Sequence, residues 1–141
     1  MLTIGEEQLK EIASHAEREY PHECCGLLIG TLEGDKKTVV ETYAIDNARE
    51  ESARHNRSLI LPVDLMRGER YARERKLDVV GNYHSHPNAP AVPSQFDLDH
   101  ALPVWSYAIA SVIGGKTEKI RSWEMENDRT KFNEEEIIKG V

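Results

Sequence analysis

Two histidines with one residue between them, His84 and His86, are the side chains in this sequence best suited to chemistry. The apolar residues 79–80 before them predict a strand, and residues i and i+2 of a strand project to the same side of a sheet. Two imidazoles on one side favour a zinc site, because zinc binds histidine nitrogen at about 2.0–2.1 Å. A catalytic zinc takes three protein ligands and keeps its fourth position open, so a third ligand is expected nearby.

Asp97 is the best candidate for the third ligand. The loop before it, residues 87–93, contains three prolines, and a stiff loop loses less entropy when the ligand becomes fixed. Asp97 also lies three residues after Ser94, at the predicted start of a short helix. Two alternatives stay open: Ser94 and Asp97 have the spacing of an ordinary capping box, and Asp99 and His100 are rival ligands.

A zinc hydrolase also needs a general base that is not itself a ligand. This group must take a proton from the attacking water and pass it to the leaving amine. Glu23 fits the role, because it stands just before an apolar run at residues 25–29 that predicts a buried strand. Composition alone does not distinguish Glu23 from the other acidic residues.

Together these residues resemble the JAMM motif of MPN+ zinc metalloproteases, and the short prokaryotic type in particular. That motif reads His-x-His-Pro, six residues, then Ser-x-x-Asp, with a glutamate well upstream; this chain has His84-Ser85-His86-Pro87 and Ser94-Gln95-Phe96-Asp97 at that spacing. The segment 20–30, which contains Glu23, resembles the family's glutamate segment. The resemblance extends from the first predicted helix to about Ile120.

The resemblance implies a role for each residue of the motif. His84, His86 and Asp97 would bind one Zn²⁺ per chain, and Glu23 would hold and deprotonate the attacking water. Ser94 would donate a hydrogen bond to the oxyanion that forms during hydrolysis; capping the short helix is its alternative role.

The resemblance also implies a substrate class. JAMM enzymes hydrolyse amide or isopeptide bonds after the C-terminal glycine of ubiquitin-like proteins. Short prokaryotic members process sulfur-carrier proteins of the β-grasp kind or remove ubiquitin-like modifiers from lysine. We therefore expect a partner with a Gly-Gly tail, which could add to a strand edge near the zinc. The identity of this partner and of the released amine, and the oligomeric state, stay open.

Two other functions compete with the hydrolase. A non-catalytic MPN-type scaffold module is one, and the complete set of motif residues argues against it. A zinc deaminase on a related fold is the other, and it would require a Cys-x-x-Cys ligand pair. The two cysteines of this chain are adjacent, at positions 24 and 25, so they do not form that pair.

The elements that must position these residues follow from periodicity and turn residues. A first helix is expected to begin at a capping box formed by Thr3 and Glu6 and to end at Pro21. Further helices are expected at residues 62–76 and from Ser94 to before Pro103. The predicted strands cover residues 25–29, 38–45, 58–61, 77–83, 104–112 and 120–125, and residues 132–138 could be helix or strand. This order predicts an α/β class, a mixed β-sheet flanked by helices, and the resemblance implies a cytidine-deaminase-like architecture.

Length, charge and cysteine content limit the functions that the chain could have. The chain has 141 residues, which predicts a single domain over 1–141. The net charge of −7 argues against a nucleic-acid partner, and no apolar run is long enough to span a membrane. Cys24 and Cys25 are adjacent, which excludes a disulfide framework and indicates the cytoplasm. Both are expected to be small buried hydrophobes, Trp105 and Trp123 to lie in the core, and the histidines at 15, 22, 55 and 100 to lie at the surface or in loops.

Overall fold

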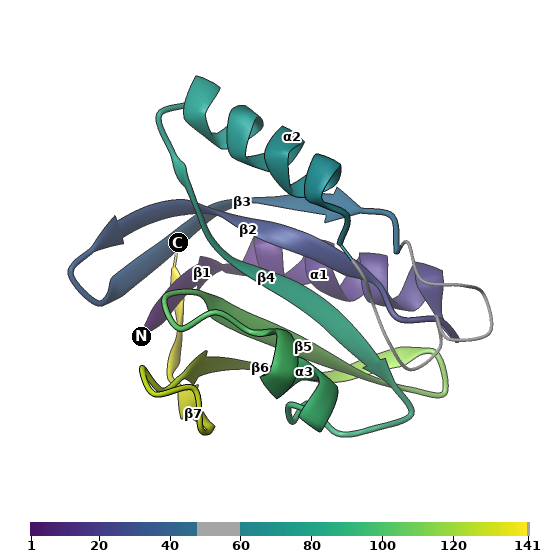
Figure 1. The fold of residues 1–141 in the computed structure, drawn as a ribbon. Coiled ribbons are helices and arrows are strands. Elements are labelled where there is room, and N and C mark those ends of the chain that lie inside the picture. The colour runs from purple at the N-terminus through teal and green to yellow at the C-terminus, as the bar shows by residue number, and fades with distance from the viewer. Residues whose placement is uncertain (48–59, 141) are drawn as a thin grey trace.

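The computed structural model describes residues 1–47 and 60–140, which form one mixed sheet with helices on its faces (Figure 1). Its strands are β1 (Leu2–Gly5), β2 (Cys25–Glu33), β3 (Lys36–Ile45), β4 (Asp78–Pro87), β5 (Ser106–Ile113), β6 (Lys116–Met125), β7 (Phe132–Glu135) and β8 (Ile137–Gly140). Their order in the sheet is β7-β6-β5-β4-β2-β3-β1-β8. The helices are α1 (Glu6–Glu19), α2 (Pro62–Glu74) and α3 (Gln95–His100). The predicted mixed sheet flanked by helices is therefore confirmed.

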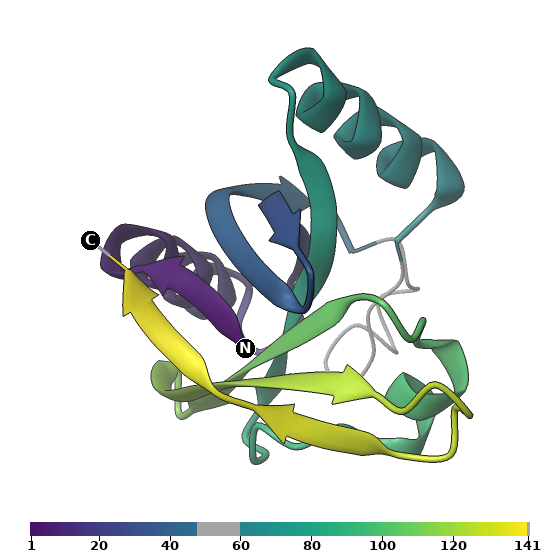
Figure 2. The ribbon, with the colours of Figure 1, turned by 90° about the vertical axis from the view of Figure 1, so that its left-hand side faces the viewer.

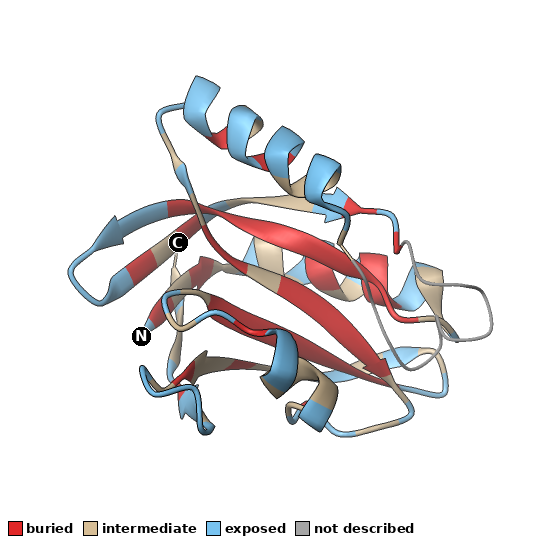
Figure 3. Cartoon of the chain, viewed as in Figure 1, coloured by how far each residue is buried: buried red, intermediate tan, exposed pale blue. Residues whose placement is uncertain are grey.

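The helices α1 and α2 cover opposite faces of the sheet, as the side chains of β2 show. Leu28 packs in one cluster with Ile12 and Ala16 of α1, whereas Leu27 packs in another with Leu65 of α2. Successive residues of a strand point to opposite faces, so these contacts place the helices on different sides. Figure 3 shows that most residues of β2, β4 and β5 are buried, although the last three residues of β2 are exposed.

The C-terminal segment, which the sequence left open between helix and strand, consists of two strands. Only Glu136 separates β7 from β8, yet these strands lie at opposite ends of the strand order. The backbone N–H of Leu2 in β1 also donates to the carbonyl of Glu136 at 2.9 Å. The sheet therefore curls until its two ends meet in one continuous piece of chain (Figure 2).

The predicted capping box of Thr3 and Glu6 is wrong. Thr3 lies inside β1, where it pairs in parallel with Thr38 of β3 and Ile138 of β8. Helix α1 begins at Glu6, and the residue before it offers no side-chain cap. Burial of Leu2 on the core side of β1, together with the two backbone ladders, outweighs one local hydrogen bond.

Other differences are smaller. The histidine strand is longer than predicted, because β4 continues through both histidines to Pro87. Of the strand expected at 58–61, residues 58 and 59 lie outside the described residues, and Leu61 is the N-cap of α2 rather than part of a strand. His15, expected at the surface or in a loop, is instead buried, and its Nδ1 lies 2.7 Å from the hydroxyl of Tyr83.

Gly68 lies in the middle of α2, where glycine is unfavourable, and packing explains why it is there. A Cβ atom at this position would lie 2.2 Å from Cδ1 of Leu27, which is fully buried in β2. Glycine costs a helix interior about 1 kcal/mol relative to alanine. Here it lets α2 approach the sheet, which places Leu65 of the same helix beside the histidine-bearing face.

Candidate metal centre

Three donor atoms from β4 and α3 meet at one point. Nε2 of His84 lies 3.2 Å from Oδ1 of Asp97, Nε2 of His86 lies 3.3 Å from Oδ2 of Asp97, and the two Nε2 atoms are 3.2 Å apart. Four zinc ligands at 2.0–2.1 Å in a tetrahedron would be about 3.3–3.4 Å from one another. The three donors therefore have the spacing of one face of a zinc tetrahedron. The structure thus brings the predicted ligand residues together, and metal binding by them stays a prediction.

The strand β4 aims both histidines. It lies in the middle of the sheet, antiparallel to β2 and parallel to β5, and His84 is paired with Cys25 on one side and Ile109 on the other. Nδ1 of His86 is 3.0 Å from the carbonyl oxygen of Pro90, to which it donates. Because Nδ1 is turned to Pro90, Nε2 is the ring nitrogen that faces Asp97 and is placed to bind a metal.

Asp97 is oriented by the start of α3. The hydroxyl oxygen of Ser94 accepts from the backbone N–H of Asp97 at 3.1 Å, and Oδ2 of Asp97 accepts from the backbone N–H of Ser94 at 2.8 Å. This reciprocal pair is the capping box considered as the alternative role of both residues, and here it holds the carboxylate toward the histidines. The Ser94 hydroxyl keeps its own proton for donation, because accepting from Asp97 uses only a lone pair.

The rival ligands lie outside this cluster. Oδ1 of Asp99 accepts from Nε2 of Gln95 at 2.8 Å on the exposed side of α3. Nδ1 of His100 lies 2.8 Å from the carbonyl of Phe96, and its ring stacks on the Phe96 ring. Among the described residues, the group of side chains that could hold a metal ion is His84, His86 and Asp97.

The charges of the cluster reinforce each other. Burial disfavours the charged form of His84, but the carboxylate of Asp97, with a smaller contribution from Glu23, raises the pKa of this imidazole. Burial also disfavours the charged form of Asp97, but His84 and the hydrogen bonds from His86 and Ser94 hold its pKa well below the usual range. A cation is therefore favoured at this point, and a metal ion would compete with the proton for it.

Glu23 is buried beside the histidine strand, with 4% of its surface exposed. The segment that carries it is bonded to Ser85, whose hydroxyl accepts from the backbone N–H of Cys24 at 2.8 Å and whose own N–H donates to the Cys24 carbonyl at 3.2 Å. The side chain of Asn47 donates to the carbonyl of Glu23 itself at 3.0 Å. Sequence reasoning missed Ser85, although its position between two histidines already placed it on the opposite face of the strand.

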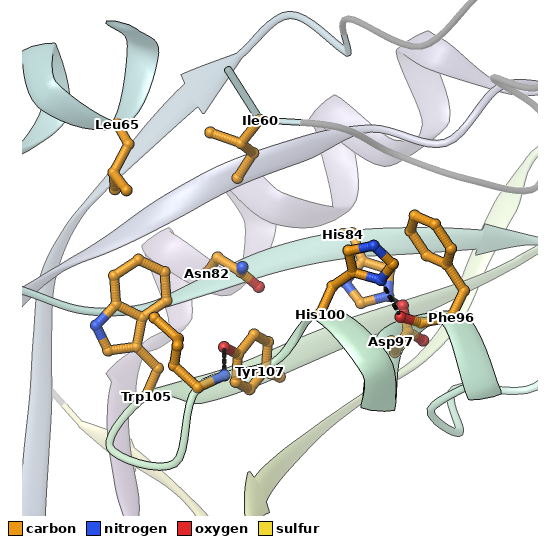
Figure 4. Close-up of a pocket in the computed structure, with 10 residues that line it drawn as sticks. Ile60, Leu65, Asn82, His84, Phe96, Asp97, His100, Trp105 and Tyr107 are labelled. Atoms are coloured by element: carbon orange, nitrogen blue, oxygen red, sulfur yellow. Dashed lines mark hydrogen bonds and ion pairs between the residues drawn. The ribbon is translucent and has the colours of Figure 1, made fainter. Parts of the chain in front are cut away.

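A cleft of about 280 Å³ begins at His84 and Asp97 (Figure 4). Its other lining residues are mostly apolar or aromatic: Ile60, Leu65, Asn82, Phe96, His100, Leu102, Trp105 and Tyr107. The expectation of a core position for Trp105 is wrong, since this residue precedes β5, is half-buried and lines the cleft. Trp123 is half-buried too, and its indole N–H donates to the carbonyl of Ala91 at 3.0 Å.

The two adjacent cysteines are inert in this arrangement. Both are free and buried, and burial raises the pKa of each thiol to about 12. A protonated buried thiol is neither a good nucleophile nor a good metal ligand. Cys24 and Cys25 therefore act as small hydrophobic residues, as expected.

The fold and the donor set together define a domain of the JAB/MPN class. Residues 5–126 match the family described as prokaryotic homologs of the JAB domain, and the chain belongs to this family. A JAB1/MPN domain protein of Archaeoglobus fulgidus has the same fold, with a TM-score of 0.59 at 18% identity over 97% of this chain and 99% of that chain.

More similar proteins are also known. The chain is 31% identical over 122 residues to a Haloferax volcanii protein named Desampylase, covering 82% of this chain and 84% of the relative. The solution structure of a Desulfitobacterium hafniense protein superposes with a TM-score of 0.87 at 31% identity, covering 99% of this chain and 93% of that one. A Salinibacter ruber protein reaches 0.77 at 36% identity, covering 98% and 91%. None of the described helices is both long and apolar enough to cross a membrane.

Proposed function

We propose that this protein is a zinc-dependent peptidase or isopeptidase that hydrolyses the amide bond after the C-terminal glycine of a ubiquitin-like or sulfur-carrier protein. One observation carries the proposal: three donor atoms of His84, His86 and Asp97 are 3.2–3.3 Å apart at the end of a cleft. Three protein ligands and an open fourth position are what a catalytic zinc centre requires, and these three residues would supply the ligands.

The chemistry divides between the metal and the side chains. A Zn²⁺ held by these three residues would act as a Lewis acid that polarises the substrate carbonyl and acidifies water. The carboxylate of Glu23 takes the proton of the attacking water and passes it to the leaving amine. Burial suits Glu23 to this role, because a carboxylate shielded from solvent is held in one place and keeps its proton from escaping to bulk water.

The hydroxyl of Ser94 stabilises the developing charge. Its lone pair is used by the capping bond from Asp97, so the hydroxyl proton can be donated to the carbonyl oxygen of the substrate. The same bond keeps the Ser94 oxygen beside the ligand carboxylate. The two roles that the sequence set against each other for Ser94 are therefore compatible.

The substrate class rests on the cleft and on one relative. A cleft of about 280 Å³ is at the small end for ligand sites, which suits a thin peptide tail better than a chain with bulky side chains. The name Desampylase denotes a protein that removes a ubiquitin-like modifier. Exposed apolar residues would meet the folded body of such a substrate: Leu102, which lines the cleft, and Leu61, Val63, Met66 and Val104, which are close in sequence to lining residues.

The structure restricts how a tail can bind. Strand β4 is paired with β2 as far as His84 and with β5 as far as Pro87, so most of the metal-bearing strand cannot receive an added strand. The tail would lie across the face of β4, between Leu65 on one side and Trp105 on the other. A tail without side chains fits that position, in keeping with a Gly-Gly terminus.

Zinc content tests the proposal first. The native protein, loaded with zinc and dialysed, should hold about one zinc per chain by elemental analysis. His84→Ala and Asp97→Ala should hold none, whereas His100→Ala, a matched change of a histidine that lines the cleft outside the cluster, should keep it. No zinc in the loaded native protein would contradict the hydrolase and favour the scaffold module.

Cleavage tests the second part. A sulfur-carrier or ubiquitin-like protein with an amine attached to its Gly-Gly tail should be cut by the loaded native protein. Glu23→Gln should keep its zinc and lose cleavage, because the amide cannot accept a proton. Zinc binding without cleavage of either kind of substrate would contradict the substrate class and leave the metal centre standing.

A further inference from the structure

Three successive carbonyl oxygens in the loop between β4 and α3 accept hydrogen bonds from side chains of the sheet. This loop, residues 88–94, is fully described and lies outside the helices and strands, so it is not held by a backbone ladder. Its middle carbonyl, that of Pro90, accepts from Nδ1 of the candidate ligand His86 at 3.0 Å. The carbonyls before and after it accept from side chains of β5 and β6. The group that orients His86 is therefore itself held from both sides.

Ser111 holds the carbonyl before Pro90. It is the β5 ladder partner of His86, so the two side chains project to the same face of the sheet. Its hydroxyl donates to the carbonyl oxygen of Ala89 at 2.6 Å, and the residue is 5% exposed. Without this donor the carbonyl would gain by turning toward water, which would move the neighbouring peptide.

Trp123 holds the carbonyl after Pro90. Its indole N–H donates to the carbonyl oxygen of Ala91 at 3.0 Å. The guanidinium of Arg121 lies over the indole, 4.7 Å from the ring centroid, and makes two bonds of 2.7 and 2.8 Å to Glu134 of β7. An indole has one N–H and no acceptor, so a phenyl ring in its place could not hold the loop.

The aim of a metal ligand depends on the rotation of its ring. Nε2 of His86 lies 3.2 Å from Nε2 of His84 and 3.3 Å from Oδ2 of Asp97, and rotation of the His86 ring would move it away from both. The bond from Nδ1 to the Pro90 carbonyl fixes that rotation. Loss of such an outer partner usually weakens metal binding by about 10–100-fold. A Pro90 carbonyl that is free to move would have a similar effect.

We propose that Ser111 and Trp123 are positioning residues that fix the Pro90 carbonyl and, through it, the His86 ring of the metal centre. Both act through the loop backbone rather than as ligands. The effect on metal affinity rests on the proposed function, whereas the effect on the ring requires no metal. The metal centre thus depends on side chains of β5 and β6 that lie outside its ligand motif.

NMR of the metal-free protein tests the effect on the ring. In chelated, ¹⁵N-labelled native protein, the Nδ1 proton of His86 should exchange slowly with water, and His86→Gln identifies its signal. Ser111→Ala and Trp123→Phe each remove one donor to the loop and should speed the exchange about tenfold, because the bond to Pro90 opens more often. The matched control is Ser122→Ala, which removes another buried hydroxyl and should leave the rate unchanged. Exchange as fast in native protein as in the variants would overturn the inference.

Zinc affinity gives a second measure. In a competition titration with a chelating indicator, the dissociation constant should rise about tenfold in Ser111→Ala and in Trp123→Phe and stay unchanged in Ser122→Ala. Unchanged affinity in both loop variants, or an equal loss in Ser122→Ala, would overturn the inference. Either loop variant is sufficient if the other does not fold. Absence of zinc from loaded native protein would overturn the proposed function, and proton exchange at His86 would still decide the inference.

Discussion

Replacing Ser85 with alanine should weaken both the fold and the candidate site, and the structure allows the two effects to be separated. Ser85 is fully buried, and its hydroxyl oxygen is the acceptor for the backbone N–H of Cys24 at 2.8 Å. Alanine leaves that N–H buried and unpaired, which costs about 1–3 kcal/mol of unfolding free energy. For a domain of this size, each kcal/mol lowers Tm by about 2–4 °C.

The second effect is on Glu23, which stands one residue before Cys24. With the Ser85 bond lost, the segment before β2 is held to β4 by the bond from the Ser85 N–H to the Cys24 carbonyl. We expect the position of the Glu23 carboxylate to broaden, and kcat to fall about tenfold or more, because proton transfer requires hydrogen-bond distance. Zinc affinity should change little, since the backbone of β4 and both histidines stay in place.

Ser122→Ala is the matched control. Ser122 is also fully buried in the sheet, and its hydroxyl donates to Oε1 of Glu135 at 2.6 Å, on β6 rather than at the site. Urea unfolding in the presence of a chelator gives the free energies without a contribution from metal binding. A loss below about 0.5 kcal/mol in Ser85→Ala would refute the hydrogen-bond reasoning. Equal losses of kcat in the two variants would refute the positioning of Glu23.

Three further predictions address the site, the fold and the substrate. With chelator present, the pair of His84 and Asp97 should stabilise the fold most between about pH 4 and pH 6.5. The pKa of His84 is raised in the folded protein, so its contribution is lost as the pH rises through that pKa. The pKa of Asp97 is lowered in the folded protein, so its contribution is lost as the pH falls through that pKa. Urea midpoints across pH should show this maximum in native protein and not in His84→Gln. Gly68→Ala should lower the free energy of unfolding by about 1 kcal/mol, because overpacking against Leu27 outweighs the gain in helix propensity, and a higher midpoint would contradict the close approach. Met66→Asp should raise KM for a folded carrier and leave cleavage of a short tail peptide unchanged, and equal effects on both substrates would contradict docking at this residue.

The ligand cluster could be predicted from sequence because its geometry is local. The pleat of a strand places His84 and His86 on one side, and a capping box orients Asp97 by contacts within four residues. A short stiff loop between the histidine strand and the helix is enough to bring Asp97 close to the two histidines. Glu23 was different: its partner strand is more than 60 residues away, and the family resemblance rather than any local pattern selected it.

The errors fall where distant chain segments decide the structure. Thr3 has the local spacing of a cap, but parallel pairing with residues at 38 and 138 makes it part of a strand. Trp105 has the apolar character of a strand residue, but β5 begins one residue later and leaves the indole at the cleft. Neither the pairing of Thr3 nor the position of Trp105 at the cleft can be predicted from the residues next to them in the sequence.

The chemistry of this site and its selectivity depend on different groups of atoms. The groups that would hold the metal are oriented largely by backbone atoms: the Pro90 carbonyl for His86, and the Ser94 N–H for Asp97. Backbone groups do not change when the side chains around the cleft change. The apolar side chains that line the cleft, such as those of Ile60, Leu65 and Leu102, make no hydrogen bonds to the ligands. Changes in the cleft wall, for example at Leu65 or Trp105, can therefore alter which tail is accepted without moving the ligands.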